Sequence, residues 1–252
     1  MPQTDWGWLI EPAELATWII SNDQRFLVVN KPGFVVCHPS KHGPWSSLIG
    51  ACREYLGVER LHMPSRLDRE TSGVMVFVKD QSLASELQRA AQHRRVHKSY
   101  LAVLTGELRE PVTVDQPIGR ASDSRVIVKR GIVAGGQQAQ TLFEPISTTD
   151  RYTLARVTPL TGRLHQIRVH ASWMGHSIAG DKLYGPDETL FLEFIEHGFT
   201  QRLADALPLS RHALHATRIE FETGAGTFRF EAPLPEDLRR FCIEQMLKLP
   251  AD

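Results

Sequence analysis

Apolar residues along this chain follow two different periods, one typical of strands and one of helices. The run at residues 73–78 is almost continuously apolar, which predicts a strand in the centre of a sheet. Apolar residues three and four apart predict helices over 46–56, with Ser46 as N-cap and Gly57 just past the end, and over 82–93. The other expected elements are helices at 12–20, 164–174 and from Pro235 onward, strands at 26–30, 99–104, 112–114, 126–128, 138–146 and 152–158, and a hairpin at 217–230.

Strands outnumber helices in this pattern, and short connections join most of them. The pattern therefore predicts an α+β fold, with a mixed, mainly antiparallel sheet flanked by helices and loops. No repeat, low-complexity tract or linker divides the chain, so we expect a short N-terminal extension over residues 1–22 and a single domain over 23–252. No Gly-rich phosphate loop follows a strand, which argues against a Rossmann or P-loop site.

Composition narrows the setting of the protein. The chain has 252 residues, of which 42% are hydrophobic, but no apolar stretch approaches the roughly 20 residues that span a bilayer. The N-terminus lacks the features of a secretory signal. Three cysteines are an odd number without metal-like spacing, so a reduced, cytoplasmic location is expected.

Charge is balanced overall but unevenly distributed. The chain has 29 basic and 29 acidic residues, yet residues 89–98 and 151–170 carry arginine, lysine and histidine with no acid. Acids gather instead at 187–196 and 231–244. A neutral total can therefore still present a polyanion-binding face. The alternative is that these runs are merely solvated helix faces.

The densest chemical motif is Arg66-Leu67-Asp68-Arg69-Glu70-Thr71-Ser72-Gly73, directly before the central strand. Its aspartate sits between two guanidinium groups, which favour the ionised carboxylate. The Thr-Ser-Gly segment that follows supplies hydrogen bonds and a flexible turn. Asp68 is therefore a candidate nucleophile or base on a fixed loop, the alternative being an ordinary surface Asp–Arg pair.

A second dense polar segment covers residues 161–170. Arg163, Gln166 and His170 are expected on one outer helix face, with Thr161 as a possible N-cap, and such side chains suit phosphate and sugar oxygens. The histidines at 165, 170 and 176 raise the possibility of a metal site. Their spacing does not group them on a helix and no Glu or Cys accompanies them, so no metal is expected.

Taken together, these segments resemble the RluA-type family of RNA pseudouridine synthases. The matching blocks, in order, are residues 28–32 with His38-Pro39, 66–73, 98–103, 162–170 with Gly180-Asp181 and Tyr184-Gly185, and 214–216. The resemblance covers residues 23–232 and implies the pseudouridine synthase fold. Many relatives carry an N-terminal S4 RNA-binding domain, for which residues 1–22 are too few. The chain also departs from the family pattern, because Gly33 comes early in the first block and Phe34 follows it.

The resemblance implies roles for five residues. Asp68 is the catalytic aspartate, which either attacks the anomeric carbon or removes a sugar proton. Arg168 pairs with this aspartate. Tyr100 stacks on the target base and is a candidate catalytic group for moving a proton from the ring carbon late in the reaction. Leu214 packs on the other side of the base pocket. Arg66 enters the RNA stack where the flipped uridine has left.

The implied reaction is isomerisation of uridine to pseudouridine in structured tRNA or rRNA, without metal or cofactor. Other substrate contacts are expected from Lys31, Arg163, His165, Gln166 and His170. No membrane or protein partner is indicated, and we expect a monomer. One alternative is a non-catalytic RNA-binding protein on the same scaffold. Another is an unrelated hydrolase that uses Asp68 with His165 or His170.

Overall fold

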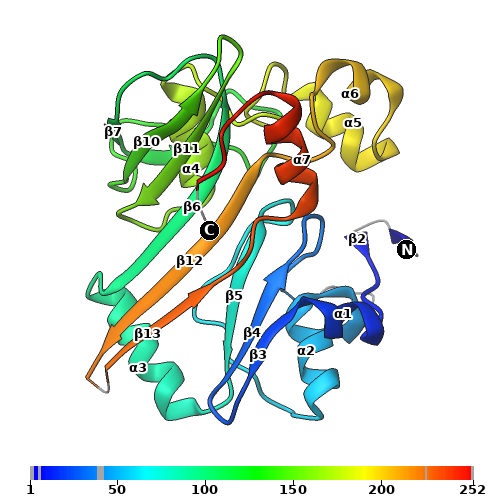
Figure 1. The fold of residues 1–252 in the computed structure, drawn as a ribbon, viewed down its shortest axis with the longest axis vertical. Coiled ribbons are helices and arrows are strands. Elements are labelled where there is room, and N and C mark those ends of the chain that lie inside the picture. Colours follow the sequence, from blue (N-terminus) through cyan, green and yellow to red (C-terminus); the bar gives the residue numbers. More distant parts are fainter. Residues whose placement is uncertain (1–2, 5–6, 39–42, 225, 251–252) are drawn as a thin grey trace. The chain divides into compact units, whose positions relative to one another are not determined.

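The computed structural model describes residues 3–4, 7–38, 43–224 and 226–250 (Figure 1). The chain forms two compact units, the first made of residues 1–98 and 216–235 and the second of 99–215 and 236–252. The boundaries fall inside strands β6 (Val96–Thr105) and β12 (Leu214–Thr223), so both strands contribute residues to each unit. Strand pairing within the units is antiparallel, and helices flank the strands, which confirms the predicted fold class.

The first unit is built on the central strand β5 (Ser72–Val78), all seven residues of which are buried. In sheet order, β3 (Ile19–Asn22) and β4 (Phe26–Lys31) lie on one side of β5, and β12 with β13 (Gly226–Glu231) on the other. Helices α1 (Pro12–Trp18) and α2 (Leu48–Leu56) share an apolar cluster with β4 and β5. Helix α3 (Gln81–Gln92) follows β5, and a short pair, β1 (Gln3–Thr4) with β2 (Gly7–Trp8), precedes α1.

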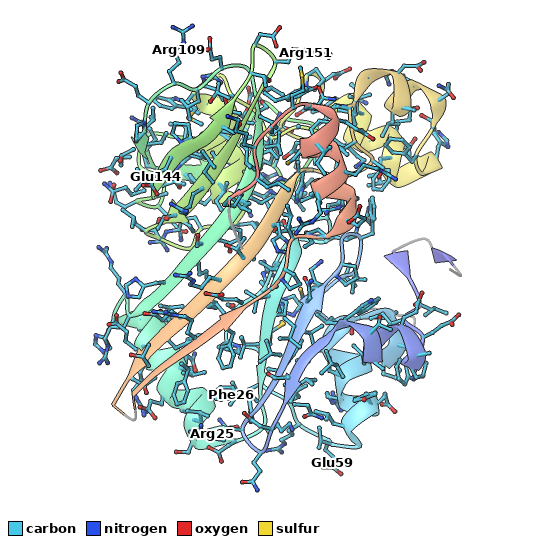
Figure 2. The ribbon with its side chains drawn as sticks, viewed as in Figure 1. Arg25, Phe26, Glu59, Arg109, Glu144 and Arg151 are labelled. Atoms are coloured by element: carbon cyan, nitrogen blue, oxygen red, sulfur yellow. The ribbon has the colours of Figure 1, made fainter. Side chains whose placement is uncertain are left out.

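Aromatic packing joins β13 to β4 in this unit. The ring centroid of Phe26 lies 5.2 Å from that of Phe228 and 5.0 Å from that of Phe230. Arg25, next to Phe26 in Figure 2, places its guanidinium 5.1 Å from the Phe228 ring centroid. The hairpin predicted at 217–230 is thus present. Its second strand is held by aromatic contacts with Phe26 as well as by backbone hydrogen bonds.

Helix α1 begins at the predicted Pro12, whereas α2 and α3 begin two residues and one residue from their predicted starts. Helix α2 begins after Ser47, whose hydroxyl accepts a hydrogen bond from the Gly50 N–H, whereas the predicted cap, Ser46, ends a 3-10 turn, Pro44–Ser46. Both serines satisfy the sequence rule, so local chemistry alone could not choose between them. Gly57 ends α2 in the left-handed conformation, as expected.

In the second unit, residues 99–105 of β6 pair with β11 (Tyr152–Pro159), which pairs with β10 (Gln140–Thr148) and then β7 (Val112–Asp115). Helix α4 (Gln166–Trp173) packs against this sheet, and β8 (Ile118–Arg120) pairs with β9 (Arg130–Ile132) in a separate hairpin. Figure 1 shows α5 (Thr189–His197) and α6 (Gln201–Ala206) as adjacent helices, which have a small core of their own. Helix α7 (Glu236–Glu244) is the last helix.

Three expectations for this unit are wrong. Residues 126–128 form a turn rather than a strand, closed by the Lys129 N–H on the Val126 carbonyl, and Ile127 is 74% exposed. The last helix, expected from Pro235 onward, ends at Glu244, and Met246 beyond it is 81% exposed. Helices α5 and α6 were not predicted, because the acids at 187–196 obscured a short apolar stripe. Among the described residues, no helix is long and apolar enough to cross a bilayer.

Candidate active-site residues in two units

The Asp68 loop runs from residue 66 to 71, directly before β5, in the first unit. Asp68 is partly buried. Its backbone carbonyl accepts a hydrogen bond from the Thr71 N–H at 3.2 Å. Buried side chains bind the carbonyls on either side. Cys37 Sγ donates to the Leu67 carbonyl at 3.3 Å, and Lys31 Nζ donates to the Arg69 carbonyl at 3.0 Å. The backbone that carries the carboxylate is therefore fixed on both flanks.

Lys31 is fully buried, which is unusual for a lysine. Besides the Arg69 carbonyl, its ammonium donates to the carbonyls of Pro32 and Val35, each at 2.9 Å. These contacts satisfy the charge with carbonyl dipoles and join the end of β4 to the Asp68 loop. The ammonium thus faces backbone carbonyls, and the expected contact of Lys31 with substrate stays a prediction.

Gly73, at the end of the Asp68 loop, allows the backbone to approach strand β12 closely. Its φ is +123°, and a Cβ at this position would lie 2.3 Å from the Ala216 carbonyl oxygen of β12. Only glycine permits this approach of two backbones. The Thr-Ser-Gly segment therefore serves close packing as well as turn formation.

The first motif block shows the effect of its departure from the family pattern. Phe34 adopts a left-handed backbone with φ of 69°, at the position where the family pattern commonly has glycine. Arg66 is exposed, and its positive charge adds to burial in lowering the pKa of His38. The insertion of Arg66 into an RNA stack stays a prediction. Pro39 lies outside the described residues.

In the second unit, α4 begins at an unusual backbone conformation. His165 is the N-cap and has φ of 57°, a left-handed value that non-glycine residues rarely adopt. Its Nδ1 lies 2.9 Å from the Tyr184 hydroxyl, and the two rings meet edge to face. The helix therefore starts later than the predicted residue 164, and the His165 ring is directed at Tyr184.

Arg168 and Asp181 form a buried bidentate ion pair. Arg168 Nε donates to Oδ2 at 2.7 Å and Nη2 to Oδ1 at 2.9 Å, and Oδ1 also accepts the backbone N–H groups of Leu183 and Tyr184. The Arg168 guanidinium lies 4.9 Å from the Tyr184 ring centroid. Burial alone would raise the pKa of Asp181, but Arg168 and these hydrogen bonds hold it far below its usual value.

Tyr100 and Leu214 are the other proposed pocket residues, and both belong to the second unit. Tyr100 lies on β6 opposite Val157 of β11 and is 8% exposed. Leu214 begins β12 and is 4% exposed. Asp68 and Arg66 belong to the first unit, so the pairing of Arg168 with Asp68 and the stacking of Tyr100 on a base stay predictions.

The expected outer face of α4 is wrong for two of its three members. Gln166 and His170 are 4% and 0% exposed, because residues 166–171 are all buried. The Gln166 amide donates to the Thr141 hydroxyl, which lies 2.9 Å from His170 Nδ1, while His170 Nε2 lies 3.0 Å from the Gln116 carbonyl. A carbonyl only accepts, so Nε2 carries the proton, and burial lowers the pKa of His170. These two residues join α4 to β10, and their expected contact with substrate stays a prediction.

Arg163 is the third member of that face, and it differs from the other two. It is partly exposed, and its Nε donates to the Gln138 carbonyl at 3.0 Å. Its backbone N–H donates to the Gln166 side-chain oxygen, which also accepts from the Thr161 hydroxyl. The turn before α4 is thus organised by Gln166 and not by a Thr161 cap.

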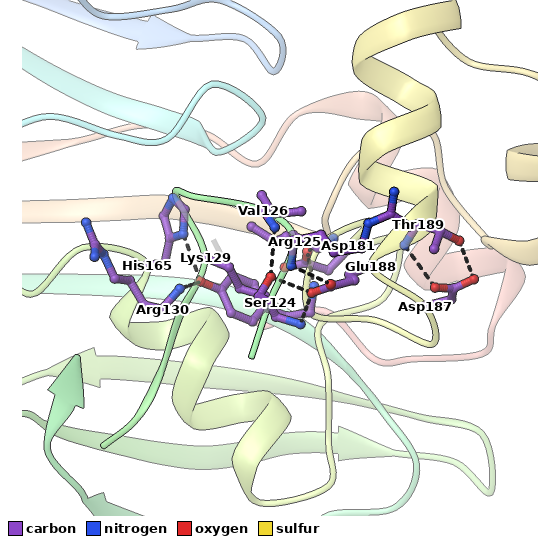
Figure 3. A network of polar contacts seen from close by, with 12 residues as sticks. Ser124, Arg125, Val126, Lys129, Arg130, His165, Asp181, Asp187, Glu188 and Thr189 are labelled. Atoms are coloured by element: carbon purple, nitrogen blue, oxygen red, sulfur yellow. Dashed lines mark hydrogen bonds and ion pairs between the residues drawn. The ribbon is translucent and has the colours of Figure 1, made fainter. Parts of the chain in front are cut away.

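One acidic side chain ties the 124–129 loop to the start of α5, as Figure 3 shows. Glu188 accepts hydrogen bonds from the Ser124 hydroxyl, the Arg125 N–H and the Lys129 ammonium. The loop then leads to Arg130, whose N–H donates to the Tyr184 hydroxyl at 2.9 Å. Loop, α5 and the Tyr184 ring over Arg168 therefore form one connected network.

Sequence reasoning missed the roles of Asp181, Tyr184 and Thr141. Asp181 and Tyr184 stood in a recognised motif, so their position was visible but their contact with Arg168 was not. Thr141 carries no signal in the sequence, because one buried hydroxyl on a strand resembles any other. Among the described residues, no three His, Cys, Asp or Glu side chains are grouped to hold a metal ion.

Residues 25–173 match the family model described as RNA pseudouridylate synthase. A Bacillus subtilis (strain 168) protein named as an uncharacterized RNA pseudouridine synthase, YjbO, is 35% identical over 239 residues, covering 92% of this chain and 77% of the relative. A Vibrio parahaemolyticus protein named ribosomal large subunit pseudouridine synthase D is 33% identical, covering 90% and 70%. Among solved structures, human RNA pseudouridylate synthase domain containing 4 is similar, with a TM-score of 0.74, 26% identity and coverage of 95% and 97%.

Proposed function

Because this chain belongs to the RNA pseudouridylate synthase family and isomerises uridine to pseudouridine in RNA, we propose that its substrate is a uridine in structured ribosomal RNA. The observation that carries this proposal is the family match over residues 25–173, which includes Asp68, Tyr100 and Arg168. Ribosomal RNA is favoured over transfer RNA because relatives at 33% identity are named for the large ribosomal subunit.

In the proposed reaction, the base leaves its sugar nitrogen link, rotates, and rejoins through a ring carbon. Asp68 acts at the sugar, either as nucleophile at the anomeric carbon or as the base that removes a sugar proton. Its fixed loop supports this role, because a carboxylate held by carbonyl contacts on both flanks needs little reorganisation during the reaction.

The other groups bind or orient. We assign Tyr100 to the face of the flipped base and Leu214 to the opposite wall. Arg168 keeps Asp68 ionised, and its own direction is set by Asp181. Arg66 fills the place in the RNA stack that the uridine leaves.

The remaining residues named from sequence divide into two groups. Arg163 has its terminal nitrogens available to RNA phosphates and is proposed as a substrate contact. We assign positioning roles to residues that bind other parts of the protein, namely Lys31, His165, Gln166 and His170.

The test is complementation of a strain that lacks the gene, followed by chemical mapping of pseudouridine in its total RNA. Asp68→Asn should restore no site, whereas the matched control Glu59→Gln, an exposed acid in the same unit, should restore every site that the wild type restores. Wild-type modification by Asp68→Asn would refute the catalytic assignment. Retained RNA binding with no product from the wild type would favour the non-catalytic alternative.

We further propose that the protein works as a monomer in the cytoplasm. Light scattering after gel filtration should give a mass near 28.4 kDa, that of one chain. A stable mass of twice that value would overturn the monomer.

A further inference from the structure

The C-terminal end of α3 and the turn after it carry a cluster of cations that the proposed reaction does not use. Arg89 lies in the last turn of the helix, and Arg94 and Arg95 lie in the turn beyond it. All three side chains are exposed, as are those of His93 and His97. No acid occurs between residues 89 and 98. We call the three arginines the α3 arginine cluster.

Among the described residues, none of these arginines forms an ion pair, although acids lie close by. Several other exposed arginines are paired, including Arg109 with Glu107 and Arg202 with Glu193. The acids of the neighbouring β12–β13 hairpin are bonded to other partners. These pairs are Glu220 with Arg229, Glu222 with His97, and Glu231 with Arg218.

The turn holds its arginines in a fixed arrangement. The Arg94 and Arg95 N–H groups donate to the Ala91 and Ala90 carbonyls at 3.2 and 2.8 Å, and the Arg95 carbonyl accepts the Glu222 N–H of β12 at 2.9 Å. Arg94 has φ of 58°, the left-handed conformation that helix ends usually give to glycine. An arginine therefore stands where the backbone conformation favours another residue, and such outliers often mark function.

Stabilisation of the helix end does not account for the cluster. Cations favour the C-terminal end of a helix through its dipole, but this effect falls off within the last turn. It therefore applies to Arg89. Arg94 and Arg95 lie beyond the helix, where their positive charges repel one another unless an anion is present.

We propose that the α3 arginine cluster binds the phosphate backbone of the RNA substrate, at a place separate from the residues assigned to the flipped uridine. This inference rests on the proposed function, because RNA is the polyanion that the enzyme must hold. Exposed guanidinium groups bind phosphate oxygens without reading base identity. The cluster therefore contributes affinity for RNA in general and not choice of uridine.

The expected effect is a change in the salt dependence of binding. Each phosphate contact contributes roughly 0.7 to 0.9 to the slope of log Kd against log salt concentration, so removal of three contacts lowers that slope by about 2 to 3. A slope change of about 2 reduces the ratio of Kd values between 50 and 200 mM salt by about 16-fold.

The test compares the triple variant Arg89→Gln, Arg94→Gly, Arg95→Gln with the wild type. The probe is a fluorescein-labelled, 30-nucleotide RNA hairpin of mixed sequence, titrated by anisotropy between 50 and 200 mM KCl. A matched triple variant removes the same charge at ion-paired surface arginines, namely Arg109→Gln (labelled in Figure 2), Arg202→Gln and Arg240→Gln. The α3 variant should bind the hairpin more weakly and show a smaller slope of log Kd against log salt concentration. The Kd of the matched variant should stay within about threefold of that of wild type.

Arg94→Gly alone separates binding from folding. Glycine relieves the left-handed backbone, so this variant should melt at a higher temperature and still bind the hairpin more weakly. A raised melting temperature with unchanged affinity would overturn the inference, as would equal salt slopes for the α3 and matched variants.

The fate of the proposed function is read separately, from pseudouridine formation in total RNA of the deletion strain. With saturating protein, the single-turnover rate of the α3 variant should equal that of wild type, because its Asp68 loop is intact. A wild-type enzyme that forms no pseudouridine but shows the expected salt slopes would refute the function and retain the RNA-binding surface.

Discussion

Asp181→Asn removes the negative charge that faces Arg168 while keeping nearly the same side-chain shape. The wild-type carboxylate is 0% exposed and accepts four hydrogen bonds, two from Arg168 and one each from the Leu183 and Tyr184 N–H groups. In an asparagine at this position, the side-chain NH₂ group replaces one of these two acceptor oxygens and faces hydrogen-bond donors. The variant therefore creates a repulsive contact as well as losing a charge.

The expected loss is large because the guanidinium stays buried. Removing one partner of a buried ion pair costs about 3–5 kcal/mol, and here the guanidinium loses its bidentate carboxylate. The matched control is Glu107→Gln, whose acid pairs with Arg109 at 2.8 Å but is 41% exposed. Exposed pairs contribute roughly 0–1 kcal/mol, so the control should be close to wild type.

The assay is urea unfolding at pH 7, repeated at lower pH. The pKa of Asp181 in the folded protein lies below its ordinary value of 3.8, so its stabilisation is fully present above that pH. It is lost as pH falls through the lowered folded-state pKa. The stability gap between wild type and Asp181→Asn should therefore be constant from pH 7 to about pH 5 and narrow in stronger acid. A gap no larger than that of Glu107→Gln would refute the reasoning.

Three further predictions concern burial and close packing. Lys31→Met should lower the free energy of unfolding by about 3 kcal/mol, because three carbonyls lose their donor. It should also slow single-turnover catalysis, and unchanged kinetics would argue that Lys31 does not position the Asp68 loop. Gly73→Ala should cost about 3 kcal/mol or more in a denaturant titration, because its Cβ overlaps the Ala216 carbonyl, and wild-type stability would contradict that contact. Burial raises the pKa of all three thiols, that of Cys242 to about 11, so iodoacetamide at pH 8 should leave the native protein unlabelled by mass spectrometry and label it fully in urea; rapid native labelling would show a thiolate at Cys37, Cys52 or Cys242.

The sequence was sufficient where periodicity and motif spacing act locally. The continuously apolar run at 73–78 became a fully buried strand, and the 217–230 hairpin formed as expected. Residues 126–128 show the limit of such reasoning. Val-Ile-Val favours a strand by propensity, but contacts of Glu188 with Ser124, Arg125 and Lys129 fold this segment into a turn. A partner about 60 residues away leaves no local trace.

The same difference between local sequence signals and tertiary contacts applies to the candidate site residues. Motif matching identified Asp68. The hydrogen bonds from Lys31 and Cys37 to the neighbouring backbone carbonyls are tertiary contacts that a motif does not reveal. For Gln166 and His170 the helical period suggested an outer face, yet the helix is buried all round at these positions. Polar residues on a helix indicate exposure only when no internal partner is present, and Thr141 supplies that partner.

Glu188 has a consequence for how this protein diversifies. Because one carboxylate fastens the 124–129 loop to the head of α5, neither segment is an independent module. A chimera that exchanges residues 188–206 with those of a relative also replaces Glu188, the anchor of the loop. Because Arg130 follows the loop and its N–H donates to the Tyr184 hydroxyl, the exchange also affects the contacts of Tyr184. A working exchange therefore has to include the 124–129 loop together with residue 188.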